Sequence, residues 1–273
     1  MDNVLGYAGK RVIITGCFSG MGEAAAQVLL DLGAEVHGFD YKPCALPLAS
    51  FTQLDLRDPA SIEAGVAGVG GKVDALFNCA GLPNGSFDPL DVMKVNFIGL
   101  RHLTEQVLPL MGEGGAIASI ASTGGLGWSR NIPTNMEFVT TQGWQAAMDW
   151  CTAHPDAVRE GYAFSKENVI VWTQYMGALL IKRGIRINCT LPSPTQTPMM
   201  ADFHKNSGKD VVDAATQPMG RYSTPYEQAA PLVWLASEFA TIVNGVVLPV
   251  DGGFMGGIPT GQVDLSRMMR KAQ

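Results

Sequence analysis

The chain has 273 residues, 47% of them hydrophobic, so it can bury a substantial core as one large α/β domain or two small ones. Its formal net charge of -6 and its lack of any cluster of Lys and Arg argue against a nucleic-acid partner. Five widely spaced cysteines without a C-x-x-C pair predict free thiols and no metal site. Without a signal peptide or a membrane-spanning apolar run, the sequence predicts a cytoplasmic protein.

Short β-rich runs alternate along the chain with longer segments of helical periodicity. Strands are expected at 11–15, 35–39, 51–54, 75–78, 116–119, 185–190 and 246–250. Helices are expected at 23–32, 61–69, 91–110, 161–183 and 225–237. This alternation indicates βαβ units, and we predict one doubly wound α/β domain over residues 1–273, with a mostly parallel sheet and helices on both faces. Its ligand crevice should lie beyond the carboxyl ends of the strands.

Two segments depart from the simple alternation. Residues 123–160, with Trp128, Trp144 and Trp150, are interpreted as an insertion over the crevice or at a subunit contact, although core packing explains the tryptophans equally well. Residues 193–220 are predicted to form a substrate loop. Apolar residues in these segments and after the fourth strand predict an apolar pocket: Leu82, Pro83, Leu126, Trp128, Met199, Met200 and Phe203.

The stretch TGCFSGMG places three glycines between the first strand and the first helix. Gly16 permits a tight turn, Gly20 lets the backbone approach a pyrophosphate, and Gly22 lets the helix pack close to the sheet. Unpaired N–H groups at the helix start would face the phosphates. The loop, including Ser19 and Met21, therefore predicts a Rossmann-type dinucleotide site, although a glycine-rich turn without a ligand remains an alternative.

An acidic residue, Asp40, ends the second strand about 20 residues after the loop, where a carboxylate can accept hydrogen bonds from an adenosine ribose. Its charge would repel a 2′-phosphate, and neither Ser19 nor Tyr41 supplies a compensating cation. The sequence therefore favours NAD over NADP, with the nearby Lys42 as the opposing observation. Asp55 and Leu56 could contact the adenine, but a helix cap explains Asp55 equally well.

Tyr162 and Lys166 lie four positions apart, which places them on one face of a helix. An ammonium there would lower the pKa of the phenol and make it a usable general base. The chain resembles the short-chain dehydrogenase/reductase family over about 10–253. The resemblance is carried by this pair, the glycine loop, N-C-A-G at 78–81, Asn96 and Ser119. The chain is most similar to bacterial members related to 3α-hydroxysteroid dehydrogenase/carbonyl reductase, which carry an insertion here.

The resemblance implies a catalytic set of four residues. Tyr162 would be the acid/base, Lys166 would lower its pKa and hold the nicotinamide ribose, and Ser119 would hold the reacting oxygen. Asn96 would link the lysine to solvent through a water. Ser119 lies 43 positions before Tyr162, farther than in most relatives, so Ser122 is a competing candidate.

The resemblance also implies further cofactor contacts. Around the nicotinamide and the fourth strand these are Asn78, Ala80, Gly81, Asn188, Pro192 and Thr197. Asp251 begins a last-strand signature of structural role. Ser193 stands where the family usually has glycine, which puts the backbone near the nicotinamide, and hence the role of Thr197, in doubt.

These observations predict an NAD-dependent oxidoreductase that interconverts a secondary alcohol and a ketone, on an apolar cyclic, steroid-like, terpenoid or aryl substrate. A homo-oligomer, dimer or tetramer, is implied by the resemblance, with the insertion altering its assembly. The alternatives are a non-catalytic NAD-binding scaffold or sensor and an epimerase or dehydratase. A halohydrin dehalogenase is disfavoured by Lys166 and the intact glycines.

Overall fold

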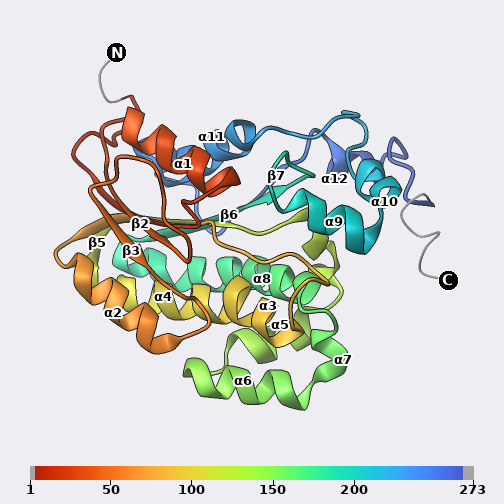
Figure 1. Cartoon of the computed structure of the whole chain (residues 1–273), viewed down its shortest axis with the longest axis horizontal. Coiled ribbons are helices and arrows are strands. Elements are labelled where there is room, and N and C mark those ends of the chain that lie inside the picture. Colours follow the sequence, from red (N-terminus) through yellow and green to blue (C-terminus); the bar gives the residue numbers. More distant parts are fainter. Residues whose placement is uncertain (1–3, 267–273) are drawn as a thin grey trace.

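Seven strands form a sheet in the computed structural model, which describes residues 4–266 (Figure 1). They are β1 (Arg11–Thr15), β2 (Glu35–Asp40), β3 (Ser50–Gln53), β4 (Val73–Asn78), β5 (Met111–Ile120), β6 (Arg186–Pro192) and β7 (Val247–Val250). Every neighbouring pair is parallel, and the order is β3-β2-β1-β4-β5-β6-β7. The order reverses between β1 and β4, so the crevice opens beyond the carboxyl ends of these two strands.

Helices cover both faces of the sheet, as predicted. One face carries α1 (Gly20–Asp31) and α11 (Pro225–Ala236), and the other carries α2 (Pro59–Val69), α4 (Gly99–Val107) and α8 (Tyr162–Leu180) (Figure 1). Successive residues of β1 point to opposite faces of the sheet. Val12 and Ile14 pack into the core under α1 and α11, while Ile13 packs into the core under α2, α4 and α8. Because helices cover both faces, the central strands β1, β4 and β6 are almost entirely buried, whereas the edge strands β3 and β7 are not, and the doubly wound α/β fold is confirmed.

The insertion forms three helices, α5 (Ile132–Val139), α6 (Gly143–Ala153) and α7 (Pro155–Val158), which lie beyond α4 and α8 from the sheet (Figure 1). Phe138 of α5, Trp150 of α6 and Phe164 of α8 are buried together, with ring centroids 4.8 to 5.5 Å apart. Core packing therefore explains Trp150, whereas Trp128 and Trp144 are only partly buried.

The remaining short helices are α3 (Pro89–Met93), α9 (Met200–Ser207), α10 (Lys209–Ala214) and α12 (Phe254–Gly257). No helix within residues 4–266 combines the length and apolar character that crossing a membrane requires.

Two elements differ most from the sequence-based expectation, and the boundaries of the others lie within three residues of it. The helix expected at 91–110 consists of α3, a π-helical turn η1 (Lys94–Ile98), α4 and a final 3-10 turn at Leu108–Leu110. Strand β5 begins at Met111 rather than at 116. The sequence did not reveal this start because its glycine-rich residues lack the apolar side chains that mark a buried strand.

Candidate active site

The glycine loop adopts a conformation that fits a bound diphosphate. Gly16 and Gly20 have φ of 75° and 67°, which side chains other than glycine adopt at a cost. A Cβ added to Gly22 would lie 2.1 Å from the carbonyl oxygen of Gly16, so only glycine lets α1 start this close to the strand. Ser19 precedes α1 without a side-chain cap among the described residues, which leaves the first N–H groups of the helix available to an anion.

The carboxylate of Asp40 faces this loop from the end of β2. It accepts hydrogen bonds from the backbone N–H of Phe18 at 2.9 Å and of Lys42 at 3.0 Å. The Lys42 ammonium lies 5.2 Å from the centroid of the Phe18 ring. The negative charge therefore stands beside the loop that follows β1, where the ribose of a dinucleotide is expected.

Asp55 has a partner that the sequence analysis did not foresee. The Arg57 guanidinium donates to both carboxylate oxygens, with Nη2 at 2.7 Å from Oδ2, and this pairing lowers the pKa of Asp55. The same guanidinium lies 5.7 Å from the centroid of the Tyr41 ring. Leu56 is buried. The carboxylate of Asp55 thus supports the loop after β3 rather than standing free for an adenine.

The loop after β4 is fixed by polar contacts. The Thr15 hydroxyl accepts from the backbone N–H of Cys79 and of Ala80, while Asn78 donates to the Thr104 hydroxyl at 3.1 Å. Gly81 lines the cavity described below. Asn78 is therefore a buried sheet contact, and its neighbours Ala80 and Gly81 are the residues nearer the crevice.

The π-helical turn η1 positions Asn96. Its Oδ1 accepts from the backbone N–H of Leu82 at 2.7 Å, and its Nδ2 donates to the Leu82 carbonyl at 3.0 Å and to the Ser165 hydroxyl at 3.2 Å. Such turns occur mostly as single insertions in α-helices, often at functional sites. Asn96 thus connects the loop after β4 to α8.

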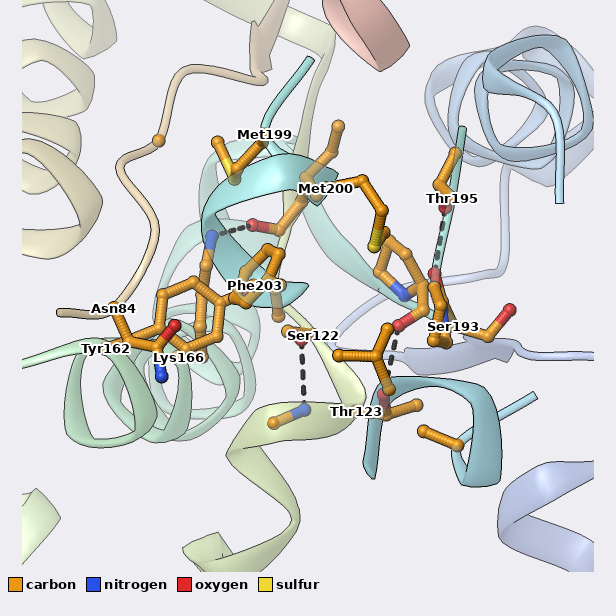
Figure 2. A pocket seen from close by; sticks show the side chains of 18 of the residues that line it. Asn84, Ser122, Thr123, Tyr162, Lys166, Ser193, Thr195, Met199, Met200 and Phe203 are labelled. Carbon is orange, nitrogen blue, oxygen red and sulfur yellow. Dashed lines mark hydrogen bonds between the residues drawn. The ribbon is translucent and has the colours of Figure 1, made fainter. Parts of the chain in front are cut away.

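Tyr162 and Lys166, at the start of α8, lie beside Ser122. The Ser122 hydroxyl interacts with the Tyr162 phenol and lowers the pKa of that phenol, and it accepts from the backbone N–H of Gly124 at 2.9 Å. The Lys166 ammonium donates to the Ile120 carbonyl at 2.9 Å and lies 5.9 Å from the centroid of the Tyr162 ring. Figure 2 shows the three side chains in the walls of one cavity.

The electrostatics of this pair differ from the expectation. Burial raises the pKa of Tyr162 above its ordinary value, and the interaction with Ser122 offsets only part of that rise. Burial also lowers the pKa of Lys166 to about 8. The predicted lowering of the tyrosine pKa by the lysine is therefore not found, because desolvation dominates at both groups. The phenol holds its proton at neutral pH.

Ser119 lies elsewhere. Its hydroxyl accepts from Asn78 at 3.2 Å, inside the sheet, where Ser119 is paired in register with Asn78 of β4. It is buried and does not line the cavity. Strand β5 ends at Ile120, so Ser122 is the serine that emerges at its carboxyl end. The structure thus brings Ser122, rather than Ser119, to the tyrosine.

The end of β6 borders the same cavity. Pro192, Ser193 and Thr197 line it, and the Thr197 side chain lies beside Gly20 of the glycine loop. Asn188 instead joins β6 to the chain entering β7, since its Oδ1 accepts from the backbone N–H of Val246 at 3.0 Å. Ser193 is accommodated and buried.

The last-strand signature has the structural role that the resemblance implied. The Asp251 carboxylate accepts from the backbone N–H of Gly253 at 2.9 Å and of Met255 at 2.8 Å, which caps the start of α12.

The cavity has a volume of about 330 Å³ and lies between the loops after β4, β5 and β6 and the helices α8, α9 and α10. Its walls are mostly apolar. Met199 and Met200 at the start of α9 and Phe203 within it lie across from Ser122 in Figure 2, and the Phe203 ring meets Tyr162 edge-on at 5.2 Å. Leu82 and Leu126 line it as expected, whereas Trp128 does not.

Sequence reasoning missed several polar residues of this cavity, namely Asn84, Thr123, Glu160, Thr195 and Ser207. Asn84 carries no motif signal. Glu160 precedes Tyr162 by two positions, and that proximity was the available signal.

Comparison with known proteins decides the family. Residues 10–133 match a family model described as short chain dehydrogenase, and residues 153–255 match one described as enoyl-(acyl carrier protein) reductase. Coniferyl-alcohol dehydrogenase from a Pseudomonas species is 34% identical over 245 residues, covering 89% of this chain and 96% of that protein. The chain belongs to the short-chain dehydrogenase/reductase family.

Other members of the short-chain dehydrogenase/reductase family support this assignment. The 3-alpha-hydroxysteroid dehydrogenase/carbonyl reductase of Comamonas testosteroni is 27% identical over 248 residues, covering 89% of this chain and 95% of that protein. The crystal structure of 3-alpha-hydroxysteroid dehydrogenase from Pseudomonas sp. B-0831, complexed with NADH, is 25% identical with a TM-score of 0.78. That likeness covers 93% of this chain and 100% of the other.

The predicted resemblance to the family is confirmed. As a short-chain dehydrogenase/reductase, the chain is an alcohol dehydrogenase/ketone reductase that uses a nicotinamide dinucleotide. The open N–H groups of α1, the glycines beneath them and the carboxylate beside the loop fit such a cofactor.

Proposed function

We propose that the chain is an NAD-dependent enzyme that interconverts a secondary alcohol and a ketone on an apolar cyclic or aryl substrate. One observation carries the proposal. The hydroxyls of Ser122 and Tyr162 stand together in the wall of an apolar cavity of about 330 Å³ that also reaches Met21 of the glycine loop. A substrate oxygen placed there meets two hydroxyl groups, while its carbon skeleton meets apolar side chains.

The residues divide the chemistry between them. A bound nicotinamide supplies or accepts the hydride. Tyr162 gives its proton to the carbonyl oxygen during reduction, and its raised pKa keeps the phenol protonated at neutral pH for this role. Ser122 donates a hydrogen bond to the same oxygen as charge develops on it.

Two further residues support Tyr162. Lys166, 5.9 Å from the tyrosine ring, places positive charge where a phenolate must form during alcohol oxidation. Asn96 is a positioning residue, because it fixes the loop after β4 to α8.

The choice of NAD rests on Asp40. Its carboxylate faces the glycine loop and would repel a 2′-phosphate, whereas a ribose hydroxyl can donate to it. The competing cation, Lys42, lies over the Phe18 ring. We expect the Lys42 ammonium in this position not to reverse the preference for NAD over NADP.

The substrate class is supported by the cavity walls and by the relatives. One relative is named for coniferyl alcohol, which carries an aromatic ring, and two are named for 3-alpha-hydroxysteroids. Leu82, Leu126 and Phe203 offer flat apolar contacts to rings of either kind.

The cofactor is tested by fluorescence titration of the purified protein with NADH and with NADPH. We expect NADH to bind at least about tenfold more tightly, a difference of ~1.4 kcal/mol. Asp40→Ser should bring the two affinities together. Tighter NADPH binding by the unaltered protein would contradict the NAD proposal.

The reaction is tested by following NADH consumption with alkyl aryl ketones and cyclic ketones. Tyr162→Phe and Ser122→Ala should each lower kcat by roughly 100-fold or more. Ser119→Ala is the matched control and should retain kcat within about threefold, because its hydroxyl lies inside the sheet. Turnover lost in Ser119→Ala but kept in Ser122→Ala would return the role to Ser119.

Two results together would favour a non-catalytic scaffold. The protein would turn over none of the ketones, and it would bind NADH with an affinity that Tyr162→Phe does not change.

A further inference from the structure

The cavity contains little charge. Of the residues that line it, only Lys166 and Glu160 carry charged side chains; the others are apolar or neutral. Lys166 is buried, and its ammonium is already held by the Ile120 carbonyl at 2.9 Å. A substrate that enters this space therefore meets two charges, the buried ammonium of Lys166 beside Tyr162 and the half-buried carboxylate of Glu160.

The backbone around Glu160 fixes that carboxylate at the cavity edge. Arg159 has φ of 51° and Gly161 has φ of 83°, so the chain turns sharply on both sides of Glu160 before α8 begins. One carboxylate oxygen, Oε1, accepts from the backbone N–H of Ala163 at 3.3 Å. Glu160 is half-buried, and within residues 4–266 it forms no ion pair.

The neighbourhood does not neutralise this charge. A second, smaller cavity of about 140 Å³ shares Glu160 with the first and is also lined by the buried Glu167, whose partners are the neutral amides of Asn131 and Asn135. Arg159 lines only the smaller cavity, and its guanidinium donates to a backbone carbonyl. Negative charge therefore dominates this side of the substrate cavity.

We infer that Glu160 is a specificity-determining residue, which selects neutral or cationic ketones and alcohols and rejects those bearing a carboxylate. This inference rests on the proposed function, since it concerns the substrate of the same site. Two like charges repel more strongly in a partly buried cleft than in water. A substrate carboxylate also loses the water molecules that solvate it, and the apolar walls offer no hydrogen-bond donors to replace them. The lone cation, Lys166, keeps its charge when it donates to the neutral Ile120 carbonyl, so its attraction for an anion opposes the effect of Glu160, and only a change at Glu160 isolates the part played by that carboxylate.

A matched charge series tests this inference. The probes 4-acetylbenzoate, 4-acetylbenzamide and 4-acetylbenzamidine share one shape and one reducible ketone, and they carry charges of about -1, 0 and +1 at pH 7. Each is reduced with NADH by the unaltered enzyme, by Glu160→Gln and by Glu137→Gln. Glu137 is an exposed residue of α5 that does not line the cavity, so its variant has the same change in net charge.

We expect the ratio of kcat/KM for the benzoate to that for the benzamide to rise roughly fivefold to tenfold in Glu160→Gln, and the corresponding benzamidine ratio to fall. Both ratios should stay at their original values in Glu137→Gln. In the unaltered enzyme, 0.5 M salt should narrow the differences, because the Debye length falls to about 4 Å. Ratios that do not respond to Glu160→Gln would overturn the inference.

Failure of the proposed function gives a different result. If the neutral benzamide is not reduced by the unaltered protein, the proposed reaction fails on its own. The charge selection is then decided by calorimetric binding of the three ketones to the protein loaded with NAD⁺, where no hydride can be transferred to them. Equal binding of the three compounds there would contradict the role of Glu160.

Discussion

Two segments border the candidate active site, and they are held in place by different forces. The insertion at 123–160 is anchored by apolar burial, since Phe138 and Trp150 pack against Phe164 of the helix that carries Tyr162. The lid, defined here as residues 199–217 with α9 and α10, covers the cavity from the other side. Helix α9 lies within the described part of the chain, and none of its residues is buried.

Helix α9 of the lid is instead held mainly by polar contacts, whereas α10 buries Val212 and Ala214. The Ser86 hydroxyl donates to Asp202 at 2.6 Å, and Asn206 donates to the Asn84 carbonyl at 2.6 Å. On its other side, His204 is hydrogen-bonded to the Tyr222 hydroxyl at 2.7 Å. Water can replace such partners at small cost, whereas it cannot replace an aromatic core. From this difference we expect the wall formed by α9 to move more readily than the wall anchored by the insertion.

The largest expected effect is on the insertion. Phe138→Ala should lower the free energy of unfolding by about 3–5 kcal/mol, because it opens a cavity among three aromatic rings. Urea denaturation followed by circular dichroism measures it. Ile132→Ala, at an exposed position of the same helix, is the control. A loss below about 1 kcal/mol for Phe138→Ala would show that the insertion is not anchored as described.

The lid should respond in the opposite way. The double variant Asp202→Ala, Asn206→Ala should change the free energy of unfolding by less than about 1 kcal/mol per lost hydrogen bond, yet raise KM for a ketone by roughly threefold to tenfold. Steady-state kinetics and urea denaturation of one preparation give both values. Lys205→Ala, exposed on the same helix, should alter neither. An unchanged KM would remove the distinction between the two walls.

The smallest effect concerns motion in the intact protein. Hydrogen exchange should be faster in α9 and α10 than in α5 and α6, since exposed elements open with lower free energies. Adding NAD⁺ and a ketone, which together cannot react, should slow exchange in α9 and α10 about threefold or more while leaving α5 and α6 as they were. Equal protection of both segments would mean that neither wall opens preferentially.

Much of the fold could be predicted because its signals are local. The apolar strands and the helical periodicity between them required the parallel sheet, and the glycine spacing located the start of α1. The boundaries of β5 and the interruption of the helix at 91–110 could not be predicted. Both depend on contacts with distant residues, such as the bonds of Asn96 to the Leu82 backbone, which periodicity does not encode.

The candidate site shows the same division. Tyr162 and Lys166 were found because a spacing of four residues places them together on one helix. Ser119 and Ser122 are both hydroxyl residues near the end of one strand, and only the register with Asn78 and the end of β5 at Ile120 separates them. Glu160 was missed because its effect arises from the neutrality of the walls around it.

The π-helical turn η1 has a consequence for how this enzyme can change over evolution. The turn holds one more residue than a regular helical turn, and that surplus sets the direction in which Asn96 faces. Deleting a single residue there would convert it into a regular α-helical turn, which leaves the flanking helices in register but removes the surplus that aims Asn96 at the Leu82 backbone. Exchange of one amino acid for another leaves the number of residues in the turn unchanged. The length of this turn, as much as the asparagine within it, is therefore an inherited feature that only a gain or loss of a codon can alter.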